Sequence, residues 1–131
     1  MRFILLAATV LALHTTAAAG PEIHVRVATV ADATERAAHI ELVKQSLRAV
    51  EARTIDVVVS KLVVLANGTV SAKIEIVLSG SDGIRSMASG IATFVAPKHQ
   101  LKNQAALRKE ALDCALKALH QRFRSASKPV S

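Results

Sequence analysis

The most regular hydrophobic pattern of this chain covers residues 55–79, which read IDVVVSKLVVLANGTVSAKIEIVLS. Two runs rich in Val and Ile, residues that favour β-strands, flank Asn67 and Gly68. An Asn-Gly pair between such runs is typical of a two-residue type I′ turn, which requires positive φ at both central residues. The pattern predicts a long antiparallel hairpin around which the rest of the chain is arranged.

A two-residue turn also predicts which side chains share a face of this hairpin, because successive strand residues point to opposite faces. It places Val57, Val59, Val63 and Leu65 on the core face together with Lys61. Lys61 is a misfit there, so either its stem lies along the sheet or a β-bulge shifts the register. The opposite face is more apolar than a solvated sheet face requires, and we expect a candidate self-association face there. That face comprises Val58, Leu62, Val64 and Val77.

Two further strands are predicted, one on each side of the hairpin. Residues 22–31 alternate between apolar and polar as a half-buried strand does, and the preceding Pro21 favours a position at the sheet edge. Residues 84–96 follow a Gly- and Ser-rich turn and form the third strand of the meander. Gly90 within this strand indicates a bulge or a close approach of another backbone.

Two helices complete the predicted fold. The first begins after an N-cap at Asp32 or Thr34 and keeps helical spacing to Arg53, and the second covers residues 101–124. The second helix has a stripe of large apolar residues beside a stripe of small ones, so we expect it to contact both the sheet and the first helix. The order β-α-β-β-β-α predicts an α+β two-layer sandwich, with an antiparallel sheet and both helices on one face.

The N-terminal segment has the form of a secretory signal peptide. A positive start, an apolar run and the small residues Ala17 and Ala19 predict cleavage after Ala19, the alternative being an uncleaved anchor. We therefore expect an exported protein, periplasmic or extracellular, whose mature chain has no transmembrane span. Residues 20–131 are expected to form one small α+β domain, with a flexible basic tail at residues 125–131.

The sequence contains no arrangement of residues that indicates catalysis. It lacks a phosphate-binding glycine loop and the common motifs of metal, thiol and serine sites, and its histidines are scattered. His39 and Cys114 both lie beside or within apolar helical stripes, so we expect packing roles for them, the alternative for Cys114 being a reactive or metal-binding thiol. We expect no enzymatic activity, cofactor, metal or small-molecule substrate. The leading hypothesis is an interaction or structural domain that binds an unknown protein or a second copy of itself.

Positive charge gathers at the C-terminal end of the chain. The formal net charge is +7, and residues 97–131 carry eight Lys and Arg against two acidic residues. An alternative function is therefore binding to nucleic acid, another polyanion or an anionic surface through the last helix. Ordinary solvated lysines would explain the same residues. The candidate polyanion-binding face comprises Lys98, Lys102, Lys109, Lys117 and Arg124, with His120 on the same side by helical spacing.

Overall fold

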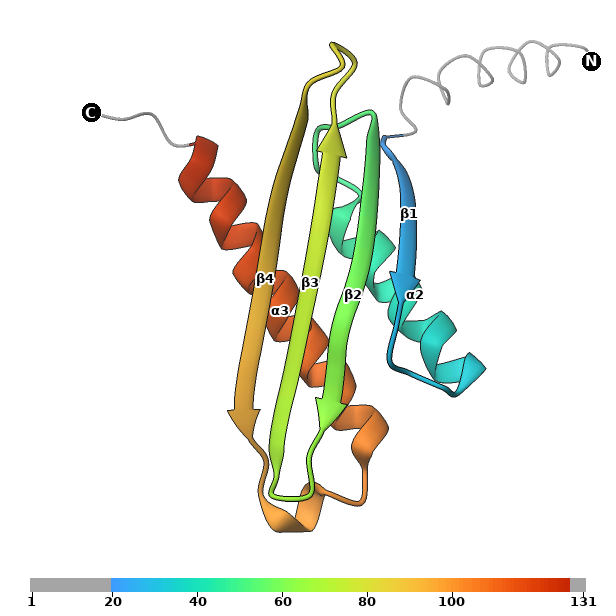
Figure 1. The fold of residues 1–131 in the computed structure, drawn as a ribbon, viewed down its shortest axis with the longest axis vertical. Coiled ribbons are helices and arrows are strands. Elements are labelled where there is room, and N and C mark those ends of the chain that lie inside the picture. Colours follow the sequence, from blue (N-terminus) through green and yellow to red (C-terminus); the bar gives the residue numbers. More distant parts are fainter. Residues whose placement is uncertain (1–19, 128–131) are drawn as a thin grey trace, which may run out of the picture.

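Four strands form one sheet, in the order β1-β2-β3-β4, in the computed structural model, which describes residues 20–127 (Figure 1). Both helices lie behind this sheet in Figure 1, α2 towards β1 and α3 towards β4, so the α+β class and the two layers are as predicted. The strands are β1 (Glu22–Val27), β2 (Thr54–Val64), β3 (Thr69–Ser79) and β4 (Arg85–Val95). The helices are α2 (Ala33–Leu47), the 3-10 helix η1 (Lys98–Gln100) and α3 (Gln104–Ser127).

The sheet is mixed, which corrects the prediction that it is antiparallel. β1 pairs with β2 in parallel, whereas β2 with β3 and β3 with β4 pair antiparallel. The cause is α2, which carries the chain back to the end where β1 began, so that β2 runs in the same direction. The predicted element order is met in part, because η1 intervenes between β4 and α3.

The hairpin between β2 and β3 is present, but its turn is not of type I′. Gly68 has φ of 95°, whereas no residue other than glycine has positive φ within the described residues. The N–H of Gly68 donates to the carbonyl of Leu65, and the N–H of Leu65 donates to the carbonyl of Thr69. These bonds define a three-residue loop whose last residue, Gly68, takes the left-handed conformation.

The longer loop moves half of the hairpin by one residue and corrects the predicted core face. Next to the turn, Leu62 pairs with Ala72, and Leu62 is 1% exposed. A register shift between Val59 and Lys61 then restores the predicted facing of the earlier residues. The β-bulge that the Lys61 misfit suggested is therefore present, and Lys61, on the turn side of it, lies on the exposed face.

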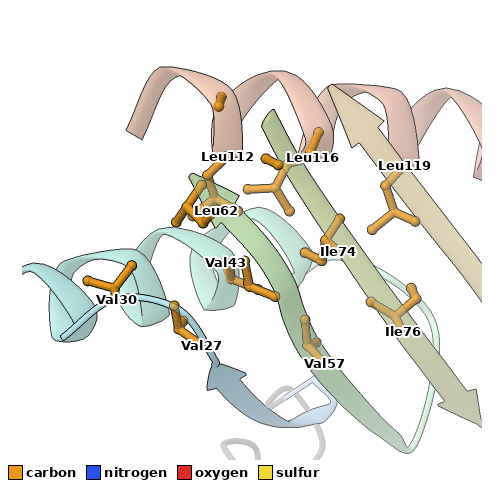
Figure 2. Packing of buried hydrophobic residues seen from close by; sticks show 14 of the residues in the cluster. Val27, Val30, Val43, Val57, Leu62, Ile74, Ile76, Leu112, Leu116 and Leu119 are labelled. Carbon is orange, nitrogen blue, oxygen red and sulfur yellow. The ribbon is translucent and has the colours of Figure 1, made fainter. Parts of the chain in front are cut away.

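The core fills the space between the inner sheet face and the two helices. Figure 2 shows Leu62, Ile74 and Ile76 of the sheet among Leu112 and Leu116 of α3. Also buried in this layer are Val43 and Leu47 of α2, Val57, Val59 and Val70 of the sheet, and Leu119 of α3. One apolar layer therefore joins residues that are far apart in the sequence.

The helices differ from their predicted extents. Asp32 is the N-cap of α2, as predicted, and its carboxylate accepts a hydrogen bond from the N–H of Glu35 at 2.8 Å. α2 ends at Leu47 rather than near Arg53, and α3 continues to Ser127, into the expected tail. The predicted signal peptide, residues 1–19, and the end of the tail, residues 128–131, lie outside the described residues.

Candidate interaction surface

The two outermost strands of the sheet differ in length and in the chemistry of their outward residues. β1 has six residues, follows Pro21, and exposes Glu22, His24 and Arg26. Shortness, charge and an adjacent proline are the features by which natural sheet edges resist pairing with other chains. β4 has eleven residues, and its only ionisable side chain is Arg85 at its start. The unprotected edge of the sheet is therefore β4.

A row of apolar side chains follows β4 on the outer face of the sheet. Met87, Ile91 and Val95 are exposed to 81%, 56% and 73% respectively. The polar residues Ser89 and Thr93 alternate with them on the same face. Large apolar side chains exposed in a row along a strand mark an interaction surface, because covering them with another chain removes apolar area from water and lowers the free energy. We call these five residues, with the backbone edge that they flank, the β4 edge.

The backbone of the β4 edge has unpaired hydrogen-bonding groups. At the two ends of the β3–β4 ladder, Gly80 donates to Ile84 and Ala96 donates to Gly68, so both of these pairs are hydrogen-bonded. Hydrogen-bonded and non-hydrogen-bonded pairs alternate along an antiparallel ladder, and the register is unbroken between these ends. The even-numbered residues of β4 therefore bond to β3. The odd-numbered residues, 85 to 95, direct their N–H and C=O groups away from the sheet.

The structure brings together only part of the predicted self-association face. Val58 and Val77 lie half-buried on the outer face, but Leu62 and Val64 belong to the core side because the turn has three residues. The prediction was wrong for these two residues. The apolar residues of the β4 edge were missed, because the Ser- and Gly-rich start of this strand gave no way to assign its faces. Their spacing of four residues was the available signal.

The predicted polyanion-binding residues are only partly brought together. Lys98, Lys102 and Lys109 are exposed around the start of α3, whereas the Lys117 Nζ lies 3.4 Å from Asp113 Oδ2. The prediction for His120 was wrong, because its ring contacts Ser46 Oγ of α2 at 2.8 Å. Arg124 lies in α3 where only the backbone is described.

A partly buried polar cluster joins the two helices. The Arg108 guanidinium of α3 donates two hydrogen bonds to the Glu35 carboxylate of α2, at 2.5 and 2.7 Å. His39 Nε2 lies 2.9 Å from the same carboxylate, and the His39 side chain is 3% exposed. The hydrogen bonds from Arg108 lower the pKa of Glu35 to about 2, against the opposing effect of burial and with a smaller contribution from His39. With each group satisfied by another and little access for a ligand, the cluster acts as a clamp between helices.

One surface hollow lies away from the β4 edge. It has a volume of about 640 Å³, lies between loops at one end of the sheet and is lined by residues 20–21, 48–53 and 80–82. Within residues 20–127, no group of three or more His, Cys, Asp or Glu side chains is placed to hold a metal ion. Cys114 is a half-buried free thiol.

None of the helices in the described part of the chain is long and apolar enough to cross a membrane.

Comparison with known proteins identifies no family for this chain. No protein-family model and no curated protein matches it. Among solved structures, it is similar to a variant of PelC from Paraburkholderia phytofirmans, a dodecamer, at 14% identity and a TM-score of 0.38, covering 76% of this chain and 88% of that one. It is also similar to a "putative lipoprotein" from Caulobacter crescentus CB15 at 15% identity and a TM-score of 0.34, covering 82% of this chain and 93% of that one.

Proposed function

We propose that this chain is an exported, non-enzymatic interaction domain whose binding surface is the β4 edge. The observation that carries the proposal is the coincidence, on one long outermost strand, of exposed apolar side chains with unpaired backbone groups. An incoming strand would receive main-chain hydrogen bonds for affinity and apolar contacts for specificity. The opposite edge, β1, has the charged residues that discourage such pairing.

Export is supported by the leader pattern of residues 1–19. Produced in a secreting bacterial host with a C-terminal tag, the protein should have the mass of residues 20–131 plus the tag. A matched variant, Ala19→Leu, removes the small residue at the cleavage position and should leave the leader attached. A mass that includes Met1 for the unchanged sequence would contradict cleavage.

The interaction surface can be tested by placing a photoreactive benzophenone side chain at Ile91. In cells of its own organism, illumination should link this position covalently to another polypeptide. The control is the same side chain at Gln45, an exposed residue of α2 far from β4. Adducts from position 91 alone would support the proposal, whereas equal labelling from both positions, or none from 91, would contradict it.

A second candidate function is attachment to polyanions, and a specific observation favours it. Lys98, Lys102 and Lys109 are all exposed around η1 and the start of α3, in the part of the chain that carries the positive surplus. Such attachment would be weak, would not depend on the nucleotide sequence of a bound nucleic acid, and would be strongly reduced by salt. It uses a different surface from the β4 edge, so the two functions can be separated by variants.

A further inference from the structure

We infer that the occupant of the β4 edge is a second copy of this chain, whose β4 pairs antiparallel with the first and is centred on Ile91. The inference rests on the proposed function, because it names the partner of the same surface. It would join the two four-stranded sheets into one continuous sheet of eight strands, related by a two-fold axis beside Ile91.

The pattern of residues along the β4 edge is symmetric about Ile91, as a two-fold interface requires. On one side stand Ser89 and Met87, and on the other, at equal distances, stand Thr93 and Val95. Antiparallel pairing centred on Ile91 therefore sets apolar residues opposite apolar ones and hydroxyls opposite hydroxyls. A shift of one pairing step would instead set Ile91 opposite Ser89 of the other copy.

The same register satisfies the backbone. Residues 87, 89, 91, 93 and 95 all direct their N–H and C=O groups to the free edge, and centring on Ile91 pairs each with another member of this set. Each hydrogen-bonded pair exchanges two bonds, so the junction would contain about ten, the number found in a typical protein–protein interface. Without a partner strand, these N–H and C=O groups can form hydrogen bonds only with water.

The inner face offers complementary sizes at the same junction. Centring on Ile91 brings the half-buried Phe94 of one copy beside Ala88 of the other, and Gly90 beside Ala92. Next to Ala88, a mainly apolar hollow of about 470 Å³ extends below the start of β4, between this strand and Phe123 of α3. The ring of the other copy's Phe94 would lie at its mouth, so a large side chain meets a small one and an unfilled space.

Within the paired strands no charge opposes the pairing, and the edge is long enough for a stable contact. Residues 86–97 contain no ionisable side chain, so the two strands place no like charges opposite each other. Ten residue intervals at about 3.3 Å give an edge of roughly 33 Å. With the sheet and helix layers together roughly 20 Å deep, each copy would bury on the order of 650 Å², near the standard value of about 800 Å².

The free flank of α3 fits the same arrangement. Arg108 and His120 bond to α2 on one side of this helix, and the half-buried Cys114 and Ala118 lie on the other. Since α3 passes beneath β4 at Gly90, a two-fold axis beside Ile91 brings the two α3 helices close to each other under the junction. Small side chains on this flank permit such an approach.

The register can be tested with cysteines placed along β4 in a Cys114→Ser background. Residues of a hydrogen-bonded antiparallel pair have Cα atoms about 5.5 Å apart, within the range of a disulfide. Ile91→Cys should therefore form a covalent dimer under mild oxidation. Ser89→Cys and Thr93→Cys should each remain monomeric on non-reducing gels, but should cross-link when the two variants are mixed.

Sedimentation of the protein purified after export provides the second measurement. The unchanged protein should be a dimer at tens of micromolar, and Ile91→Lys should raise the dimer dissociation constant at least about tenfold, because two lysines would meet at the axis. Gln45→Lys adds the same charge away from β4 and should leave the dimer intact. Circular dichroism should show both variants folded.

The outcomes separate the inference from the proposed function. Cross-linking at 91, and between 89 and 93, supports the second copy and the register. Cross-linking between 89 and 91 instead, or a monomer without cross-links, overturns the inference. If the unchanged protein is a monomer but the benzophenone at 91 still links to a different protein, the proposed function stands without the second copy. If position 91 links to nothing in cells, both fail.

Discussion

Gly90 sets the distance between the sheet and α3. A β-carbon at this position would lie 2.2 Å from the carbonyl oxygen of Ala115 and 3.1 Å from the Leu119 side chain. The first of these is backbone, which cannot rotate away, so the close approach predicted for Gly90 is confirmed and its reason is the helix beneath it. Ala115, whose carbonyl makes this contact, is fully buried.

Gly90→Ala should destabilise the protein by about 1–3 kcal/mol, the usual range for overpacking. In an ordinary strand the same change would be neutral or stabilising, because glycine costs more conformational entropy on folding than alanine does. Urea unfolding measures the difference. Ser89→Ala is the control, because this neighbouring side chain lies on the outer face. Equal stability of Gly90→Ala and the unchanged protein would contradict the close contact.

Glu35 makes the stability of the interhelical clamp depend on pH. Its pKa is lowered from 4.5 to about 2, chiefly by the hydrogen bonds from Arg108. A carboxyl group with a lowered folded-state pKa stabilises the protein above its unfolded pKa, and this contribution disappears as the pH falls through the folded pKa. At about 1.4 kcal/mol per pKa unit, the contribution at neutral pH is at most about 3 kcal/mol, and screening by solvent near the surface reduces it.

The unfolding free energy should therefore fall between about pH 5 and pH 2, and the fall should be smaller in Glu35→Gln. Glu35→Gln should itself be less stable than the unchanged protein at pH 7, because it leaves the partly buried Arg108 without its charged partner. Chemical denaturation at a series of pH values tests both statements. Parallel pH profiles for the two proteins would show that another carboxylate causes the acid sensitivity.

At the scale of the elements, the hairpin was predictable but its exact turn was not. Asn67 and Gly68 fit both a two-residue type I′ turn and a three-residue loop that ends in a left-handed glycine. The difference of one residue reverses the facing of Leu62 and Val64, since the side-chain period of a strand is two. Lys61 was the informative residue, because a charged side chain on a core face signals a register error.

The parallel pairing of β1 with β2 could not be predicted from the sequence either. Alternation in residues 22–27 gives a half-buried strand whichever way its neighbour runs, so the pattern predicts the strand without its partner or direction. The helices were easier to predict from the sequence, because the N-cap at Asp32 and the apolar stripes are local signals. The β4 edge could be identified only from the structure, because its exposure depends on β4 being outermost in the sheet.

Gly68→Val should lower the unfolding free energy by at least about 1 kcal/mol, since a β-branched residue resists positive φ. A β-carbon there would also lie 3.0 Å from the carbonyl oxygen of Ala96, whose N–H donates to Gly68. The thermal midpoint should fall, whereas Ala66→Val, at a loop position without positive φ, should change it less. An unchanged midpoint for Gly68→Val would contradict the left-handed loop residue.

The whole molecule separates its apolar and its basic surfaces. The β4 edge carries no charge between residues 86 and 97, whereas the positive surplus lies from residue 97 onwards, around η1 and along α3. Residues 20–96 are neutral, with eight basic and eight acidic side chains. The two surfaces can therefore be altered independently, which allows attachment to polyanions to be tested without disturbing the β4 edge.

Binding to heparin or to anionic vesicles should depend on where the charge lies, and not only on how much there is. The triple variant Lys98/Lys102/Lys109→Gln should elute from heparin at lower salt than the unchanged protein, because fewer lysines contact the polyanion and fewer counterions are released on binding. The matched control, Arg26/Lys44/Lys61→Gln, removes the same charge from the β1–α2 side and the outer sheet face. If both variants elute at the same salt, net charge alone governs retention and the basic region is solvated surface.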